Sequence, residues 1–491
     1  MARIRSLGRA RALAGIALVA IITVIAACAD DDRSAESRAG AGGLAAGDRE
    51  RPNVVVVMTD DQAVDTMRAM PYTRRAIGRK GVKFDNAVVS FPLCCPSRAS
   101  FLTGQYAHNH GVLDNHEPAG GYAKLESERT LPVWLERAGY RTGFVGKYLN
   151  GYGDPDRATE IPPGWSDWYG LPKEGKKRAF DYPLNENGNL IRHGNRESDY
   201  KTDLLARTAG RFLDESAEAG APFFLWVATP APHIDKDIPR AAERNPQPAP
   251  RHLRTYAAER LPQPPSFNER DVRDKPGFVR GLQRLDDRRR RELERVYVSQ
   301  LESLRAVDDL VRRIVRTLRR RDGLDDTLLV FTSDNGFLRG QHRIASGKAK
   351  LYEESIRVPL LVRGPGFPSG RTSSDVVANI DLAPTILELA HAEADIELDG
   401  RSLLAAARGE RARRAVLLEV FERKADRFAG VRTRRFVYAE RGGDLNELYD
   451  LRRDPYQLSN RARDPRYAGV RGRLHQRLAA LRDCAGASCD A

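Results

Sequence analysis

Continuous apolar runs recur along this chain of 491 residues. Residues 52–58 form a valine-rich run, and residues 327–332 form a second one of the same kind. Three shorter apolar runs occupy residues 142–146, 223–228 and 359–362. A strand that is covered on both faces is apolar at nearly every position. The pattern therefore predicts five strands of a buried sheet.

Apolar residues at helical spacing separate several of these runs, most clearly in residues 131–139 and 297–319. Strands that alternate with helices are typical of an α/β protein, so we predict an α/β sandwich with a large, mostly parallel central sheet. Residues 235–276 are rich in proline, arginine and glutamate without clear periodicity. We interpret them as a long loop, either a substrate-facing insertion or a plain surface excursion.

The C-terminal part of the chain carries a pattern of its own. After residue 404, three strand-like pieces and a helical stretch follow one another: 415–420, 435–439, 447–450 and 467–482. We therefore predict a main domain at residues 51–404 and a smaller C-terminal subdomain at residues 405–491, which has its own antiparallel sheet.

The first 50 residues resemble an export signal followed by a linker. Four arginines precede an apolar stretch at residues 12–27, whose small residues end directly before Cys28. This pattern predicts a signal peptide with a lipobox at residues 1–28 and a lipid on Cys28; a plain signal peptide and an uncleaved anchor are the alternatives. Residues 29–50 have the composition of a flexible tether. We therefore expect an exported protein, either a cell-membrane lipoprotein or a secreted one.

The net charge of +14 raises the question of a nucleic-acid partner. No nucleic-acid-binding motif accompanies it, and the arginines are spread along the chain. The densest run, residues 288–291, lies in a helical pattern and is typical of a solvated helix face. We therefore expect no nucleic-acid partner, and the basic composition is compatible with an anionic substrate.

The cysteines fall into two pairs and the single Cys28. Cys484 and Cys489 are close enough in sequence to form a disulfide in an oxidising compartment. Cys94 and Cys95 are direct neighbours and are poorly placed to bond each other. No Cys-x-x-Cys spacing accompanies them, which argues against a zinc site.

Acidic residues follow the two longest apolar runs. Asp60 and Asp61 come directly after the first run, and Asp334 and Asn335 come directly after the second. The carboxyl ends of parallel strands gather at one edge of a sheet, where two carboxylates ~4 Å apart repel by roughly 4 kcal/mol. An isolated Asp-Asp pair would be a helix cap or a turn, but two such groups favour a hard divalent cation, Ca²⁺ or Mg²⁺.

Lys147 and His233 also follow predicted strands. Taken alone, Lys147 has the alternative of a solvated strand-end lysine, and His233 that of a loop histidine that caps a carbonyl. His342 lies in the Gly-Gln-His stretch that follows the second acidic group, and we leave open whether it lines a substrate pocket.

These residues occur in an order that resembles the type I sulfatase family of the alkaline-phosphatase-like superfamily. The matching stretches are Asp60-Asp61, Cys94-Cys95-Pro96-Ser97-Arg98, Gly146-Lys147, Pro232-His233, Asp334-Asn335-Gly336 and Gly347-Lys348. The resemblance extends from about residue 52 to residue 460, and within the family it is strongest to the N-acetylglucosamine-6-sulfatase branch and to arylsulfatases. It implies an alkaline-phosphatase-like sandwich, with the catalytic domain at residues 51–404.

The resemblance also implies a chemistry for each residue. Cys94 would be converted by a formylglycine-generating enzyme into formylglycine, whose hydrate binds Ca²⁺ (or Mg²⁺) and attacks the sulfur of a sulfate ester. The substrate would be a sulfated carbohydrate or an aryl sulfate, and the membrane would be a second partner through the lipid on Cys28. The implied metal ligands are Asp60, Asp61, Cys94, Asp334 and Asn335.

The same resemblance assigns the remaining catalytic roles. Arg98 would hold the hydrate, Lys147 and Lys348 would bind sulfate oxygens, and His233 or Lys348 would protonate the departing oxygen. The following Tyr352-Glu353 favours Lys348 over Lys350 for this position.

The chain departs from the arylsulfatase pattern at one point and leaves two other functions open. Many arylsulfatases have Lys-Trp-His where this chain has Lys147-Tyr148-Leu149, so a histidine near the hydrate is missing and Asn150 is its nearest replacement. The alternative functions are a phosphonate or phosphodiester hydrolase of the same superfamily and a non-catalytic, glycan-binding surface lipoprotein.

Overall fold

The computed structural model describes residues 51–176, 178–234, 245–410, 413, 415–421 and 427–490. The predicted signal and lipobox segment with Cys28, the tether, and part of the predicted 235–276 loop lie outside these residues. Within them, no helix combines the length and the apolar character needed to cross a membrane.

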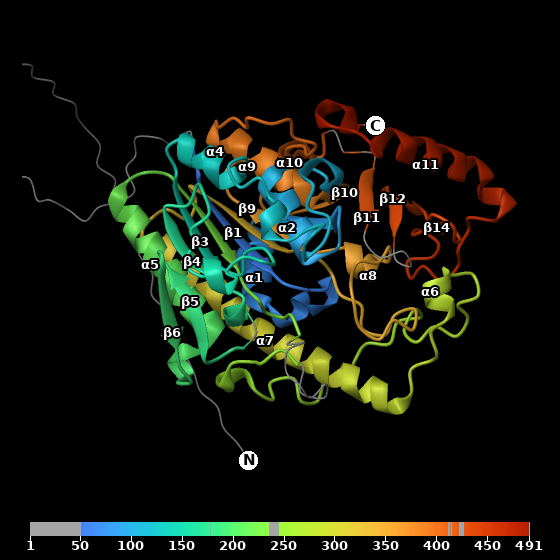
Figure 1. Cartoon of the computed structure of the whole chain (residues 1–491), viewed down its shortest axis with the longest axis horizontal. Coiled ribbons are helices and arrows are strands. Elements are labelled where there is room, and N and C mark those ends of the chain that lie inside the picture. Colours follow the sequence, from blue (N-terminus) through green and yellow to red (C-terminus); the bar gives the residue numbers. More distant parts are fainter. Residues whose placement is uncertain are drawn as a thin grey trace, which may run out of the picture. The chain divides into compact units, whose positions relative to one another are not determined.

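A ten-stranded sheet, mixed but mostly parallel, lies at the centre of the fold (Figure 1). In spatial order its strands are β10 (Arg371–Ala378), β2 (Val82–Val88), β9 (Leu360–Arg363), β8 (Thr327–Ser333), β1 (Asn53–Thr59), β7 (Phe223–Ala228), β3 (Arg141–Gly146), β4 (Asp167–Gly170), β5 (Tyr182–Glu186) and β6 (Asn189–His193). The five predicted strands are β1, β3, β7, β8 and β9, which confirms the expected α/β sandwich. The antiparallel exceptions are β9, which lies between β2 and β8, and the β4–β5–β6 meander.

Helices cover both faces of this sheet, which explains why its central strands are apolar throughout. Along β1, Val54 and Val56 belong to the core on one face, whereas Val55 and Val57 belong to the core on the other. The first face is covered by α2 (Cys94–Thr103), α4 (Leu131–Arg137), α9 (Leu382–Ala390) and α10 (Leu403–Arg408). The second face is covered by α1 (Pro71–Ala76), α5 (Lys201–Ala219) and α7 (Asp287–Arg320).

The helix α7 is longer than the predicted stretch 297–319. It begins at Asp287, after Asp286 has accepted a hydrogen bond from the main-chain N–H of Arg289 at 2.7 Å, and it packs against α5. Its additional first turns carry the arginine-rich run, in which Arg288 and Arg289 pair with Glu292. This exposed, self-paired stretch is the solvated helix face that the sequence predicts.

The C-terminal part forms a separate four-stranded antiparallel sheet, as expected. Its strands are β11 (Val416–Val420), β12 (Phe428–Arg432), β13 (Phe436–Glu440) and β14 (Glu447–Asp450). The helix α11 (Ala468–Leu481) packs on this sheet, and the predicted Cys484–Cys489 disulfide is present. The same core includes residues of three short helices, α3 (Ala107–His110), α6 (Gly277–Arg280) and α8 (Glu353–Ile356). The two sheets are therefore joined by shared packing.

Candidate active site

The order of four neighbouring strands brings the predicted polar residues together. β8, β1, β7 and β3 lie side by side and run parallel, with Thr59 in register with Ser333 and Val145 with Val227. Their carboxyl ends therefore lie at one edge of the sheet, and the segments that leave them carry Asp334, then Asp60 and Asp61, then His233 and Lys147.

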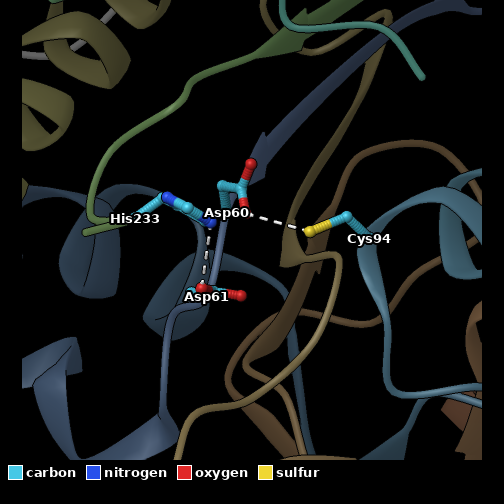
Figure 2. Close-up of side chains that lie close together, drawn as sticks. All are labelled: Asp60, Asp61, Cys94 and His233. Carbon is cyan, nitrogen blue, oxygen red and sulfur yellow. Dashed lines mark hydrogen bonds and ion pairs between the residues drawn. The ribbon is translucent and has the colours of Figure 1, made fainter. Parts of the chain in front are cut away.

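The helix α2 brings the cysteine motif to the same edge. Cys94 is its first residue, and Arg98 follows one turn later; both side chains are buried. Figure 2 shows the Cys94 sulfur pointing toward Asp60, with the Sγ–H donating to Asp60 Oδ1 over 3.5 Å, and His233 pointing toward Asp61. The amino end of a helix favours anions, because its first main-chain N–H groups are unpaired and the helix dipole is positive there.

Arg98 ties the carboxylates to the end of β3. Its Nε donates to Asp334 Oδ2 at 2.9 Å, and its Nη2 donates to Asp60 Oδ2 at 3.3 Å. Its Nη1 donates to the main-chain carbonyls of Lys147 and Tyr148. A planar guanidinium with several donors can hold these groups in one fixed arrangement, which a lysine cannot do.

Two lysines complete the charge pattern. Lys147 Nζ pairs with Asp60 Oδ2, and Lys348 Nζ lies 2.5 Å from Asp61 Oδ1 and 2.6 Å from Cys94 Sγ. Lys350, the competing residue, instead has its ammonium 5.3 Å from the ring of Phe278. The structure therefore brings Lys348, and not Lys350, to the cysteine.

The oxygen donors of this cluster fit a hard cation. Among the described residues, Asn335 Oδ1 is buried and has no hydrogen-bond partner, and Asp61 Oδ2 has only His233 Nε2 at 3.5 Å, which is costly unless a ligand satisfies these oxygens. Ligand atoms of Asp60, Asp61, Cys94 and His233 all lie within 4.8 Å of one another. Carboxylate and amide oxygens are the ligands that Ca²⁺ and Mg²⁺ prefer.

Burial and charge shift the pKa values of the site in opposite directions. Burial alone would raise the pKa of Asp60 and of Asp61. Lys147 and His233 bring the pKa of Asp60 below the usual range, and Lys348 and His233 do the same for Asp61. Burial lowers the pKa of His233, although the neighbouring Asp61 and Asp60 oppose this shift. The charged forms of Asp60 and Asp61 are therefore stabilised, whereas burial and the nearby Asp60 raise the pKa of Asp334.

A cavity of about 580 Å³ opens beside Cys94. Asp60, Lys147, His233 and Lys348 line its inner end, and Asn150 is also part of the lining. Two residues of the predicted loop, Pro246 and Gln247, line it as well, which favours the substrate-facing interpretation of that loop. The volume lies within the range of about 300–1,000 Å³ that is typical of small-molecule sites.

Three other histidines are held in the fold by packing and hydrogen bonds. His342 is fully buried, is stacked on Tyr352, and does not line this cavity. His110 is hydrogen-bonded to Ser100 of α2 at 3.0 Å, and His108 contacts the C-terminal turn at Cys484. Among the described lining residues, sequence reasoning missed a basic group, Lys173, Lys176, Arg178 and Lys201, because no strand end or motif marks them.

Comparisons with known proteins show the family of this chain. A family model described as Sulfatase matches residues 52–392, and one described as N-sulphoglucosamine sulphohydrolase, C-terminal, matches residues 340–484. The chain is 35% identical over 501 residues to N-acetylglucosamine-6-sulfatase of Homo sapiens, covering 92% of this chain and 88% of that protein. It is also 35% identical over 512 residues to an arylsulfatase of Volvox carteri, covering 91% and 76%.

Solved structures show the same fold. A protein solved in complex with its substrate D-glucosamine-2-N,6-O-disulfate superposes with a TM-score of 0.73 at 25% identity, covering 88% of this chain and 97% of that one. The phosphonate monoester hydrolase of Agrobacterium radiobacter superposes with a TM-score of 0.69 at 24% identity, covering 88% and 95%, and shows the fold alone. The fold is that of the alkaline-phosphatase-like enzymes, and the chain belongs to the sulfatase family of enzymes, which hydrolyse sulfate esters.

Proposed function

We propose that this sulfatase releases sulfate from a sulfated sugar, with residue 94 as formylglycine and with a Ca²⁺ ion at Asp60, Asp61, Asp334 and Asn335. The observation that carries this proposal is the meeting of Cys94 with Asp60 and Lys348 at the inner end of a cavity. The 35% identity to a human N-acetylglucosamine-6-sulfatase over most of both chains supports a sugar substrate.

The charge count of the site shows what a divalent cation would add to it. Three carboxylates, Asp60, Asp61 and Asp334, face three cations, Arg98, Lys147 and Lys348, so the side chains alone nearly cancel. A bound Ca²⁺ would make the site positive and would polarise a sulfate oxygen. Mg²⁺ satisfies the same donors and is the alternative ion.

The surroundings of Cys94 disfavour an unmodified cysteine as the nucleophile. Burial, together with Asp60, raises the pKa of the Cys94 thiol to about 12. A thiol is a strong nucleophile only as the thiolate, so this side chain would be mostly inactive at pH 7. Formylglycine instead offers a hydroxyl of its hydrate to the ester sulfur, and its second hydroxyl provides a route for sulfate to leave.

The other side chains have roles that follow from their positions. Lys147 and Lys348 bind the sulfate oxygens, and Arg98 holds residue 94 and the carboxylates in place. His233 or Lys348 supplies a proton to the departing sugar oxygen. Asn150 lines the cavity in place of the histidine that many arylsulfatases have, and it is the candidate to orient the hydrate.

Export and modification complete the proposal. The basic and apolar pattern of residues 1–28 supports an exported protein that is anchored through Cys28 or secreted. The partners would be a formylglycine-generating enzyme, which acts on Cys94, and the membrane, which holds the lipid.

The test uses the full chain produced with and without a formylglycine-generating enzyme. Mass spectrometry of the peptide that contains residues 93–98 reports the state of residue 94, and turnover is measured with 4-nitrophenyl sulfate, N-acetylglucosamine 6-sulfate and an aryl phosphodiester. We expect sulfate turnover in proportion to the formylglycine content, loss of turnover after chelation, and recovery with Ca²⁺. Sulfate turnover by protein that contains only thiol at residue 94, or far faster phosphodiester turnover, would contradict the proposal.

A further inference from the structure

The described part of the cavity contains a cation that the proposed reaction does not use. Lys176 lies at the end of a short 3₁₀ helix, Glu174–Lys176, and its Nζ donates to the main-chain carbonyls of Leu149 and Tyr152 at 2.9 and 3.0 Å. The ammonium also lies 5.8 Å from the centre of the Tyr152 ring. Among the described residues, no carboxylate forms an ion pair with it. An ammonium bonds three acceptors, so Lys176 retains donor capacity.

The surroundings of Lys176 disfavour its charge. Burial, and to a lesser degree the nearby Lys147, lowers the pKa of Lys176 to about 7. Arg98 also lowers this pKa, whereas Cys95 and Asp154 raise it. Lys176 is half-buried. A cation that has lost part of its water and lacks a counter-charge is costly, and an anion that binds next to it removes part of this cost.

The wall around Lys176 is basic, but its other cations have interactions of their own. Lys173 Nζ lies 3.0 Å from Asp154 Oδ1, Arg178 lies 3.6 Å from Asp181, and the Lys201 ammonium lies 4.9 Å from the ring of Tyr182. All of these cations line the same cavity as Cys94. They do not belong to the group of residues that surrounds the cysteine. The cavity wall therefore carries cations in addition to those that pair with the carboxylates at residue 94, and Lys176 is one of them.

We propose that Lys176 binds a second anionic group of the substrate, a sulfate or carboxylate, while the ester to be cleaved lies at residue 94. This inference rests on the proposed function and narrows it from sulfated sugars to sugars that carry at least two negative groups. Lys176 is therefore a specificity-determining residue that touches substrate away from the reacting atoms.

The test compares Lys176→Met with wild type on glucosamine 2-N,6-O-disulfate and on N-acetylglucosamine 6-sulfate. The preference for the disulfate is measured as the ratio of the two kcat/KM values. Because Lys176→Met loses a charge-assisted hydrogen bond to the second anion, we expect this ratio to fall about ten- to a hundred-fold, mainly through KM. A third substrate, a glucuronate-linked N-acetylglucosamine 6-sulfate, carries a carboxylate as its second anionic group. Comparing it with the disulfate shows whether Lys176 binds a carboxylate or a sulfate. Lys173→Met is the matched control, because its ammonium is exposed and paired with Asp154, and we expect it to change the ratio less than about three-fold.

Two further measurements exclude a merely structural role. Lys176 is charged below its pKa, so wild-type KM for the disulfate rises as the pH increases through about 7 to 8, and Lys176→Met lacks this rise. Lys176→Arg restores the preference for the disulfate at the higher pH, because arginine stays charged. An equal loss on both substrates, or an unchanged ratio, would overturn the inference.

Binding separates this inference from the proposed function. Calorimetric titration of the disulfate into Cys94→Ala, with and without Lys176→Met, needs no turnover. An unchanged Kd refutes the role of Lys176 even if the enzyme is an active sulfatase. If wild type cleaves no sulfate ester, the proposed function fails while this titration still decides the role of Lys176.

Discussion

Two adjacent cysteines have opposite surroundings. Cys94 Sγ lies among Asp60, Lys348 and the cavity, whereas Cys95 is fully buried in the apolar core on the α2 face of the sheet. Neighbours on a helix differ by 100° in direction, which is enough to separate a site residue from a packing residue. The difference between the two thiols is therefore one of position on α2.

This difference predicts unequal effects of alanine. Cys94→Ala removes the side chain that we propose becomes formylglycine, so we expect turnover to fall to background. Cys95→Ala removes one sulfur from a packed core, which costs about 1–2 kcal/mol of unfolding free energy and leaves most of the turnover. The measurement is turnover per folded molecule beside denaturant unfolding. Equal loss of turnover in both variants would contradict this assignment.

His108 predicts a pH effect on stability. Burial alone would lower its pKa, but Glu419 and the Cys484 carbonyl raise it to about 9. Because this value exceeds the unfolded pKa of about 6.5, charged His108 stabilises the fold fully below pH of about 6.5, and this contribution is lost as the pH rises through 9. The gap in unfolding free energy between wild type and His108→Gln should therefore shrink from pH of about 6 to pH of about 10.

Glu419→Gln is the companion variant, since it removes the charge that raises the pKa of His108. It should weaken the same pH dependence, while the hydrogen bond to the Cys484 carbonyl keeps part of it. A gap that stays constant over the pH range would contradict the pairing.

At the scale of elements, the sequence predicts the buried strands and misses the exposed or short ones. β1, β7 and β8 are buried at every position and apolar at most of them because helices cover both faces, and that pattern is visible in one sequence. β10 is polar at its start, and β4 has only four residues, so neither stands out from a loop. The sequence does indicate the β5–β6 hairpin, because Asn187-Gly188 is a typical hairpin turn. Both residues adopt positive φ in the structure.

Most residues of the candidate site could be predicted because they follow these buried strands. Asp60, Lys147, His233 and Asp334 follow strands that the sequence reveals, so their common edge follows from the topology. Lys176 comes from a short 3₁₀ helix after β4, and no local pattern indicates that its side chain reaches the cavity.

From the packing of α7 we predict how much a smaller side chain in the core lowers the free energy of unfolding. Leu304 is fully buried between this helix and the sheet, and Leu304→Ala should lower the free energy of unfolding by about 2–5 kcal/mol. Arg316→Ala, on the exposed side of the same helix, should change it by less than about 0.5 kcal/mol. Urea unfolding measures both, and similar values for the two variants would contradict the packing of α7.

At the scale of the whole molecule, residues 484–486 are bound to α3 and to Asp399, next to the segment that follows α2. Cys484 O accepts hydrogen bonds from His108 and Asn109 on α3, and Gly486 N donates to Asp399 at 2.8 Å. Asp399 in turn accepts from the main-chain N–H of Tyr106, just after α2. The last residues therefore support the segment that follows the helix of Cys94 and Arg98.

The short disulfide loop predicts a limited stabilisation. Closing the loop between Cys484 and Cys489, which are 5 positions apart, contributes roughly 2 kcal/mol by loop-closure entropy. The double variant Cys484→Ser, Cys489→Ser should lose about that much unfolding free energy and keep most of its turnover. Truncation before residue 484 also removes the contacts to His108 and Asn109, so it should cost more. Equal effects would mean that the disulfide alone fixes the chain end.

The burial of Cys94 has a consequence for biosynthesis. The side chain is 1% exposed, and one of the groups that covers it, Lys348, comes 254 positions later in the sequence. Until that part has been synthesised and folded, the cysteine is open to other proteins; afterwards it is closed. Any enzyme that alters this thiol competes with folding for a limited time. The active fraction of a preparation would then depend on the speed of translation and export as much as on the sequence.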